Sequence, residues 1–192
     1  MSLPTRPPVV IVPGLRDHVA DHWQTILAER LAAAGRDVRI VPPLTSDQLD
    51  CEARVMALEE AVAQTPGPPI LVAHSAGVMI TVHWALRNRR PVHGALLATP
   101  PDFDTPLPEG YPTPEALCQH GWTPTPRKAL PFPSIVAVSD NDPLAHPKRV
   151  AELADAWGSS LIGIGSVGHL NPAAGYGPWP RAEELVRELE LG

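Results

Sequence analysis

Residues 70–85 read ILVAHSAGVMITVHWA and place one serine, Ser75, between two kinds of apolar pattern. The first part, residues 70–73, is a continuous apolar run typical of a strand buried on both faces. From Ala76 onward the apolar residues recur at helical spacing. The stretch therefore predicts a strand, a sharp turn at Ser75 and a helix. Ser75 is either the cap of that helix or a nucleophile held at the turn.

The same alternation of short apolar runs and helical patterns extends along the chain. We expect strands at 9–13, 38–41, 70–73, 94–99, 134–139 and 160–164, and helices at 20–34, 47–64, 76–88, 147–157 and 180–189. Strands buried on both faces belong to a parallel sheet covered by helices. The pattern thus predicts an α/β fold, a three-layer sandwich with a six-stranded, mostly parallel sheet. The amino-acid composition does not change along the chain in a way that marks a linker, so we expect a single domain over residues 1–192.

Residues 99–133 are the longest stretch without clear periodicity, and the helix expected at 47–64 has more than one candidate cap. Thr45, Ser46 and Asp47 are all suitable caps for the helix expected at 47–64. Residues 99–133 form a proline-rich connector, and a connector of that length is either functional or contains short helical pieces. We expect its aromatic residues, Phe103, Tyr111 and Trp122, to pack it against the rest of the fold.

Composition excludes several classes of partner. The chain of 192 residues has a formal net charge of −6 and no basic patch, which argues against binding to nucleic acid. No apolar run is long enough to span a membrane, and the N-terminal segment does not have the pattern of a secretion signal. The two cysteines, Cys51 and Cys118, suit a reducing compartment. We expect a cytoplasmic protein whose partner is a small molecule.

Polar residues with complementary chemistry follow three of the expected strands. Ser75 follows the third strand, Asp140 and Asp142 follow the fifth, and His169 follows the sixth. The carboxyl ends of parallel strands are where open α/β sheets gather reactive groups. In acyl transfer a serine attacks the carbonyl, a histidine moves the proton, and an aspartate orients the imidazole. The order Ser, Asp, His is that of the α/β-hydrolase triad.

Two backbone N–H groups are expected to complete such a site. The N–H of Ala76, at the start of the helix, points where an oxyanion would form. The loop after the first strand supplies a second donor through the N–H of Leu15, and Gly14 permits close approach of the backbone. These two groups are our candidate oxyanion hole.

Several short motifs, taken in order, resemble one family. They are Pro13-Gly14, the segment DHWQ at 21–24, HSAG at 74–77, the loop from Ser139 to Pro143, GHLN at 168–171 and GPWP at 177–180. Together they resemble the small serine hydrolases of the retinoblastoma-binding-protein-9 and YdeN type, minimal members of the α/β-hydrolase superfamily. The resemblance spans nearly the whole chain and implies a six-stranded sheet and activity on small carboxyl esters or related acyl compounds.

The resemblance also implies roles for single residues and leaves one departure. It assigns Ser75 as nucleophile, Asp142 as acid and His169 as base. The first glycine of the usual G-x-S-x-G pattern is replaced by Ala73. The animal relative binds retinoblastoma protein through Leu-x-Cys-x-Glu, but in Leu49-Asp50-Cys51-Glu52-Ala53 the glutamate comes one place too early. We therefore do not expect that partner.

Alternatives remain open at several positions. Asp140 competes with Asp142 for the role of the acid, and either could cap the helix near Pro147. We assign five residues to the substrate pocket: Arg16, His18, Trp23, His74 and Trp179. Packing is the alternative for His74 and Trp179. His18 and His22 are four residues apart and could ligate a metal, but without a third ligand we assign no metal or cofactor.

The sequence supports three hypotheses about function. The first is a serine hydrolase acting through an acyl-enzyme, with short acyl groups because the chain has no large cap domain. The second is a binding or scaffold protein that keeps the hydrolase fold; a damaged triad would favour it, and none is visible. The third is a cofactor-free haloperoxidase or a lyase that uses the same triad.

Overall fold

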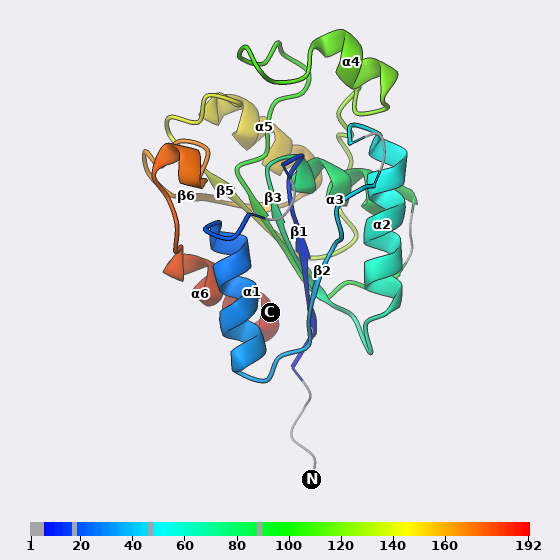
Figure 1. The fold of residues 1–192 in the computed structure, drawn as a ribbon, viewed down its shortest axis with the longest axis vertical. Helices are drawn as coiled ribbons and strands as arrows, with labels where there is room; N and C mark the ends of the chain where they lie inside the picture. Colours follow the sequence, from blue (N-terminus) through cyan, green and yellow to red (C-terminus); the bar gives the residue numbers. More distant parts are fainter. Residues whose placement is uncertain (1–5, 17–18, 46–47, 88–89) are drawn as a thin grey trace.

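The structure is a computed structural model that describes residues 6–16, 19–45, 48–87 and 90–192. Strands and helices alternate along the chain (Figure 1). The strands are β1 (Val9–Val12), β2 (Val38–Ile40), β3 (Ile70–His74), β4 (Gly94–Ala98), β5 (Ser134–Val138) and β6 (Ser160–Gly163). The helices are α1 (Trp23–Ala33), α2 (Cys51–Ala63), α3 (Ala76–Arg87), α4 (Pro114–Gln119), α5 (Pro147–Trp157) and α6 (Pro180–Leu191), with a 3₁₀ turn, η1 (Pro172–Ala174).

The six strands form one parallel sheet in the order β2-β1-β3-β4-β5-β6. Every pairing is parallel, and the register places Val12 beside Ala73 and Ala73 beside Leu97. After β1 the chain moves to one edge through β2, and after β3 it moves to the other edge. The order therefore reverses between β1 and β3, and such a switch point opens a crevice at the carboxyl ends of the two strands.

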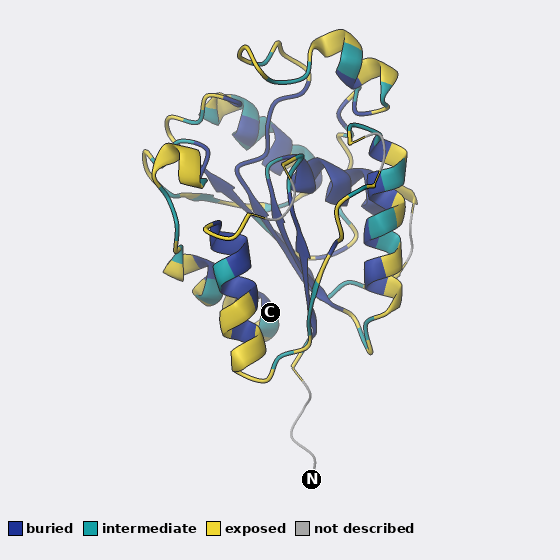
Figure 2. Cartoon of the chain, in the orientation of Figure 1, coloured by how far each residue is buried: buried dark blue, intermediate teal, exposed yellow. Residues whose placement is uncertain are grey.

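Helices cover both faces of the sheet, as the sequence predicts (Figure 1). On one face α1 and α6 pack on the sheet through a core that includes Leu27, Leu31 and Leu185. On the other face α2, α3 and α5 pack through a core that includes Leu58, Met79 and Leu153. Figure 2 shows the inner strands β1, β3, β4 and β5 buried between these two layers, whereas the edge strands β2 and β6 are partly exposed. Exposed residues lie on the outer helix faces. Continuous apolar strands are the sequence signature of this double burial.

The ends of the elements follow local chemistry. The first helix begins at Trp23 rather than Ala20, because the His22 side chain accepts a hydrogen bond from the N–H of Gln24. The second helix begins at Cys51 rather than Asp47, because Asp50 is its cap and accepts from the N–H of Ala53. Of the caps expected there, Ser46 and Asp47 lie outside the described residues, and Thr45 precedes the helix by several residues.

The connector between β4 and β5 contains one short helix, α4, capped by Thr113. Trp122 is fully buried and donates its indole N–H to the carbonyl of Leu49. Phe103 is also buried and packs edge-on against Trp122, with ring centroids 5.5 Å apart. The prediction that aromatic residues hold the connector down is confirmed for these two, whereas Tyr111 is only partly buried.

An ion pair ties the start of the connector to α5. Arg149 donates from Nε to the carboxylate of Asp102 at 2.9 Å, and the Asp102 side chain is only 3% exposed. Hydrogen bonding to Asp102 raises the pKa of Arg149 above its usual value. The connector therefore approaches the carboxyl ends of the strands along a defined path.

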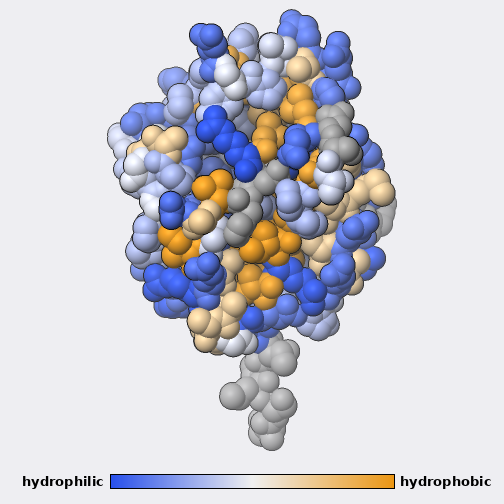
Figure 3. Space-filling view, viewed as in Figure 1, coloured by the Kyte–Doolittle hydropathy of each residue, from blue (hydrophilic) through white to orange (hydrophobic). Residues whose placement is uncertain are grey.

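The large apolar side chains that are exposed on the described surface do not belong to one element. They are scattered over different elements: Val19, Ile40, Met56, Leu86, Leu161 and Leu191. In Figure 3 the apolar groups of the visible face are small and separated by polar side chains. Within the described ranges, no helix combines the length and the apolar character needed to cross a membrane.

Candidate active site

Three side chains from three loops form one chain of hydrogen bonds. The Oγ of Ser75 lies 2.8 Å from Nε2 of His169, and Nδ1 of His169 lies 2.8 Å from Oδ2 of Asp142. A carboxylate only accepts hydrogen bonds, so Nδ1 carries the imidazole proton and Nε2 is free to accept from the serine hydroxyl. The His169 and Asp142 side chains are 6% and 3% exposed. The structure thus brings together the serine, histidine and aspartate singled out in the sequence.

Ser75 stands at a strained turn between β3 and α3. Its φ angle is +57°, in the left-handed region that non-glycine residues rarely adopt. Two hydrogen bonds fix this backbone conformation. The N–H of Ser75 donates to the carbonyl of Ala98, and the carbonyl of Ser75 accepts from the N–H of Val78. The turn projects the hydroxyl away from the sheet edge toward His169. A helix cap has extended rather than left-handed backbone, so the conformation favours the nucleophile interpretation.

The small residues around Ser75 have different reasons to be small. A Cβ on Gly77 would overlap the carbonyl of Val12 and lie 2.8 Å from that of Pro13. Position 77 therefore requires glycine for close packing of β1 on α3. Ala73 is a fully buried residue of β3, and its φ is not positive. The departure from the G-x-S-x-G pattern thus leaves the backbone geometry of the turn intact.

The loop after β1 passes directly beside Ser75. A Cβ placed on Gly14 would lie 3.2 Å from Cβ and 3.5 Å from Oγ of Ser75, which leaves little space for any side chain there. Leu15 and Ala76 both line the cavity in front of Ser75. Ala76 is the first residue of α3, so its N–H has no partner within the helix. The residues that carry the two predicted donors thus line the same cavity as Ser75.

The loops that carry Asp142 and His169 are fastened to each other. Oδ1 of Asn141 accepts from the N–H of Gly168 at 2.7 Å, and Oδ1 of Asp142 accepts from the N–H of Leu144 at 2.9 Å. Asp140 is exposed and contacts the histidine loop through its backbone N–H, which donates to Gly165. Of the two aspartates left open by the sequence, only Asp142 contacts the His169 ring among the interactions of the described residues.

A second histidine supports the first from behind. His74 is fully buried, and its Nε2 lies 2.8 Å from the carbonyl oxygen of His169. A carbonyl accepts only, so Nε2 of His74 carries the proton. Burial lowers the pKa of His74 well below its usual value, and the neighbouring His169 and His22 lower it further. His74 is therefore a neutral donor that fixes the backbone of the His169 loop.

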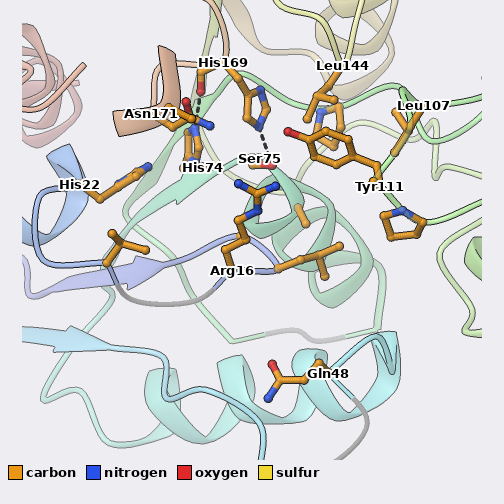
Figure 4. A pocket seen from close by; sticks show the side chains of 18 of the residues that line it. Arg16, His22, Gln48, His74, Ser75, Leu107, Tyr111, Leu144, His169 and Asn171 are labelled. Carbon is orange, nitrogen blue, oxygen red and sulfur yellow. Dashed lines mark hydrogen bonds between the residues drawn. The ribbon is translucent and has the colours of Figure 1, made fainter. Parts of the chain in front are cut away.

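A cavity of about 450 Å³ opens in front of Ser75 at the switch point between β1 and β3 (Figure 4). Its apolar wall includes Phe103 and Leu107 of the connector and Leu144 of the loop after β5. Arg16 and His74, two of the predicted pocket residues, line it, and His18 lies outside the described residues. Tyr111 of the connector and Asn171, beyond His169, also line the cavity.

Trp23 and Trp179 do not line this cavity, so their assignment to the pocket is wrong. Trp23 is buried at the start of α1 and packs edge-on against Trp179, with ring centroids 4.9 Å apart. It also meets His74 edge-on at 6.0 Å. The two indoles support the His74 side of the site from the α1 and α6 layer, which is the packing alternative left open for Trp179.

One polar residue of the site has no role predicted from the sequence. Gln24 is buried in the first turn of α1 and lines the cavity. Its Nε2 donates to the carbonyls of Val12 and Val72, at 3.2 and 2.9 Å. It thereby bridges the ends of β1 and β3 at the switch point. A glutamine in a helical pattern gives no signal of such a contact.

No group of three metal-ligating side chains occurs in the part of the chain that the structure describes.

The family follows from a comparison of the sequence with known families. A family model described as serine hydrolase matches residues 9–188, nearly the whole chain. The chain belongs to the serine hydrolase family. A search of curated protein sequences gives no match.

Solved structures agree with this membership. A YdeN-like hydrolase of Pectobacterium atrosepticum is 25% identical, with a TM-score of 0.78 over 97% of this chain and 92% of that one. The ydeN gene product of Bacillus subtilis is 19% identical, with a TM-score of 0.73 over 95% and 98%. An alpha/beta hydrolase from a lagoon-sediment metagenome is 16% identical, with a TM-score of 0.69 over 95% and 90%.

The resemblance to the YdeN type and the minimal α/β-hydrolase fold are therefore confirmed. The sheet keeps six parallel strands with helices on both faces, and the connector between β4 and β5 contains the short helix α4. This serine hydrolase has the α/β-hydrolase fold. The roles of Ser75, Asp142 and His169 in its reaction stay predictions.

Proposed function

We propose that this serine hydrolase cleaves small carboxyl esters or related acyl compounds through a Ser75–His169–Asp142 triad. The observation that carries the proposal is the hydrogen-bonded chain from Ser75 Oγ through both nitrogens of His169 to Asp142. A serine hydroxyl is a weak nucleophile unless a base takes its proton, and His169 is within reach to do so.

The proposed reaction has two halves. Ser75 attacks the ester carbonyl as His169 takes the hydroxyl proton, and Asp142 stabilises the imidazolium. The N–H groups of Leu15 and Ala76 donate to the oxyanion of the tetrahedral intermediate. His169 then gives the proton to the departing alcohol, leaving an acyl-enzyme. A water molecule that gives its proton to His169 attacks the acyl group. As the second intermediate collapses, His169 returns this proton to Oγ of Ser75 and the acid is released.

The size of the cavity supports short acyl groups. Its volume is about 450 Å³, and its apolar wall is formed by the connector together with the loops after β1 and β5. An acyl chain is stabilised there by burial of its methylene groups, each contributing about 0.8 kcal/mol. We expect kcat/KM for 4-nitrophenyl esters to rise with chain length and then fall once the chain exceeds the cavity.

A fluorophosphonate probe tests the nucleophile. The probe phosphonylates an activated serine, so wild-type protein should be labelled and Ser75→Ala should not. Ser166→Ala is the matched control, because Ser166 is an exposed serine in the loop before His169. Labelling that survives in Ser75→Ala would contradict the proposal. A folded wild-type protein that neither takes the label nor hydrolyses any ester would favour a binding protein, whereas labelling without ester hydrolysis would favour another reaction of the triad.

A further inference from the structure

The described lining of the cavity carries a single fixed charge. Arg16 is its only lysine or arginine, and no aspartate or glutamate lines it. The remaining wall is largely apolar, and the carboxylate of Asp142 is engaged by His169. A cation above an apolar wall without a matching anion attracts a negatively charged group of a ligand.

Arg16 meets a residue of the connector across the cavity. Its Cζ lies 5.6 Å from the centre of the Tyr111 ring, which places the guanidinium over the aromatic face. Within the described part of the chain, Arg16 forms no ion pair and the Tyr111 hydroxyl forms no hydrogen bond. The guanidinium N–H groups and the hydroxyl are therefore available to a ligand bound in the cavity beside them (Figure 4).

The position of Arg16 relative to the triad decides which part of a substrate it meets. His169 protonates the leaving alcohol, so the alcohol part faces His169. In Figure 4 Arg16 extends from the loop after β1 on the side of Ser75 opposite to His169, and Tyr111 lies beside it. Arg16 also follows Leu15, whose N–H is the proposed oxyanion donor. The guanidinium thus lies on the acyl side of the carbonyl that Ser75 attacks.

We propose that Arg16 determines specificity by binding a carboxylate on the acyl part of the ester, with the Tyr111 hydroxyl as a second donor. The preferred substrates are then monoesters of short dicarboxylic acids, whose methylene groups pack on the apolar wall while the free carboxylate meets Arg16. This inference rests on the proposed function, because it assigns the acyl side from the roles of Ser75 and His169.

Two esters that differ only in charge test the inference. Mono-4-nitrophenyl adipate and 4-nitrophenyl hexanoate have acyl chains of equal length and the same leaving group. A hydrogen-bonded charge pair at an exposed site is worth about a tenfold change in specificity. We expect Arg16→Gln to lower the adipate-to-hexanoate ratio of kcat/KM by about tenfold, Arg16→Lys to keep part of it, and added salt to reduce it in the wild type.

A matched variant and a third ester separate the alternatives. Lys148→Gln removes one positive charge from the exposed face of α5, outside the cavity lining, and should keep the wild-type ratio. An unchanged ratio in Arg16→Gln would overturn the inference and leave the proposed function standing. The third ester, 4-carboxyphenyl hexanoate, carries its charge in the leaving group. A loss in Arg16→Gln confined to this ester would overturn the assignment to the acyl side.

A binding measurement decides the case in which no ester is hydrolysed. That result would contradict the proposed function, so the anion site must be tested without turnover. Isothermal titration of wild type and Arg16→Gln with monomethyl adipate provides the test. We expect about tenfold weaker binding to Arg16→Gln. Equal binding to both proteins would overturn the anion site itself.

Discussion

Gly77 packs against the carbonyl group of Val12 so closely that no Cβ atom fits between them. Gly77 lies in the first turn of α3 and Val12 ends β1, so this contact joins the strand that precedes Gly14 and Leu15 to the helix that follows Ser75. The second glycine of the motif is thus required by packing and not by an unusual φ angle, because its backbone is helical.

A methyl group at position 77 should therefore damage both stability and activity. Gly77→Ala must push β1 away from α3, and overpacking of this kind costs about 1–3 kcal/mol of unfolding free energy. It also displaces Gly14 and Leu15, so kcat/KM for 4-nitrophenyl butyrate should fall. Urea denaturation and ester hydrolysis measure the two effects. Gly67→Ala is the control, because nothing lies within 4 Å of a Cβ there; equal behaviour of the two variants would refute the packing argument.

The fold was accessible from the sequence because its signals are local. Each buried strand is a continuous apolar run, and Ser75 interrupts one of them with small neighbours, so the strand, turn and helix can be assigned without knowing what packs against them. Parallel strands bring their carboxyl ends to one edge, which is enough to bring Ser75, Asp142 and His169 together.

The rest depended on contacts between distant residues. Gln24 donates to backbone carbonyls of two strands, one of them 48 residues away, and no periodicity marks such a contact. The motifs around Trp23 and Trp179 predict a place in the pocket, but the two indoles pack against each other within the layer of α1 and α6, outside the cavity lining. Tyr111 belongs to the connector whose start is bound to α5 by the ion pair between Asp102 and Arg149, two residues far apart in the sequence.

Replacing the two neighbouring aspartates should separate their roles. In Asp142→Asn the carboxylate that accepts the hydrogen bond from Nδ1–H of His169 is lost. The amide N–H₂ can donate to Nδ1 and so favours the wrong imidazole tautomer, and kcat should fall by about 10³–10⁴-fold. Asp140→Asn should stay within about threefold of wild type, because the Asp140 side chain is exposed and its contact to Gly165 uses the backbone. Steady-state kinetics on 4-nitrophenyl acetate measures both. A comparable loss in Asp140→Asn would move the acid to that position.

The buried His74 should make stability depend on pH. Its pKa is lowered in the folded protein by burial and by His169 and His22, so below about 6.5, its ordinary value, the unfolded chain binds a proton that the folded chain does not. The unfolding free energy should therefore decrease as pH falls below that value, with a slope of up to ~1.4 kcal/mol per pH unit from each such histidine. Burial lowers the pKa of His83 as well, which adds a contribution of the same sign.

His74→Gln should reduce that slope, because an amide can still donate to the carbonyl of His169 but does not titrate. Urea denaturation of both proteins between pH 5 and pH 8 measures it. Comparison at pH 8, above the ordinary pKa, separates the cost of the substitution itself from the titration. An identical slope in His74→Gln and wild type would show that His74 binds its proton equally in the folded and unfolded states.

The ion pair between Asp102 and Arg149 should couple the connector to α5. Arg149→Gln leaves the buried carboxylate of Asp102 without its partner, whereas Asp102→Asn leaves an arginine that is still 32% exposed to water. Arg149→Gln should therefore destabilise the protein more than Asp102→Asn, and the double variant should lose less than the sum. A double-mutant cycle by urea denaturation should give a coupling energy of about 1 kcal/mol.

The same cycle should register in the kinetics, because the connector that follows Asp102 supplies Leu107 and Tyr111 to the cavity wall. If the ion pair fixes that wall, KM for 4-nitrophenyl hexanoate should rise in Arg149→Gln while kcat changes less, since the triad is carried by other loops. Arg187→Gln, which breaks an exposed pair with Glu183 on α6, is the control and should alter neither stability nor KM. A coupling energy of zero, or a loss confined to kcat, would show that the connector is held in place without this pair.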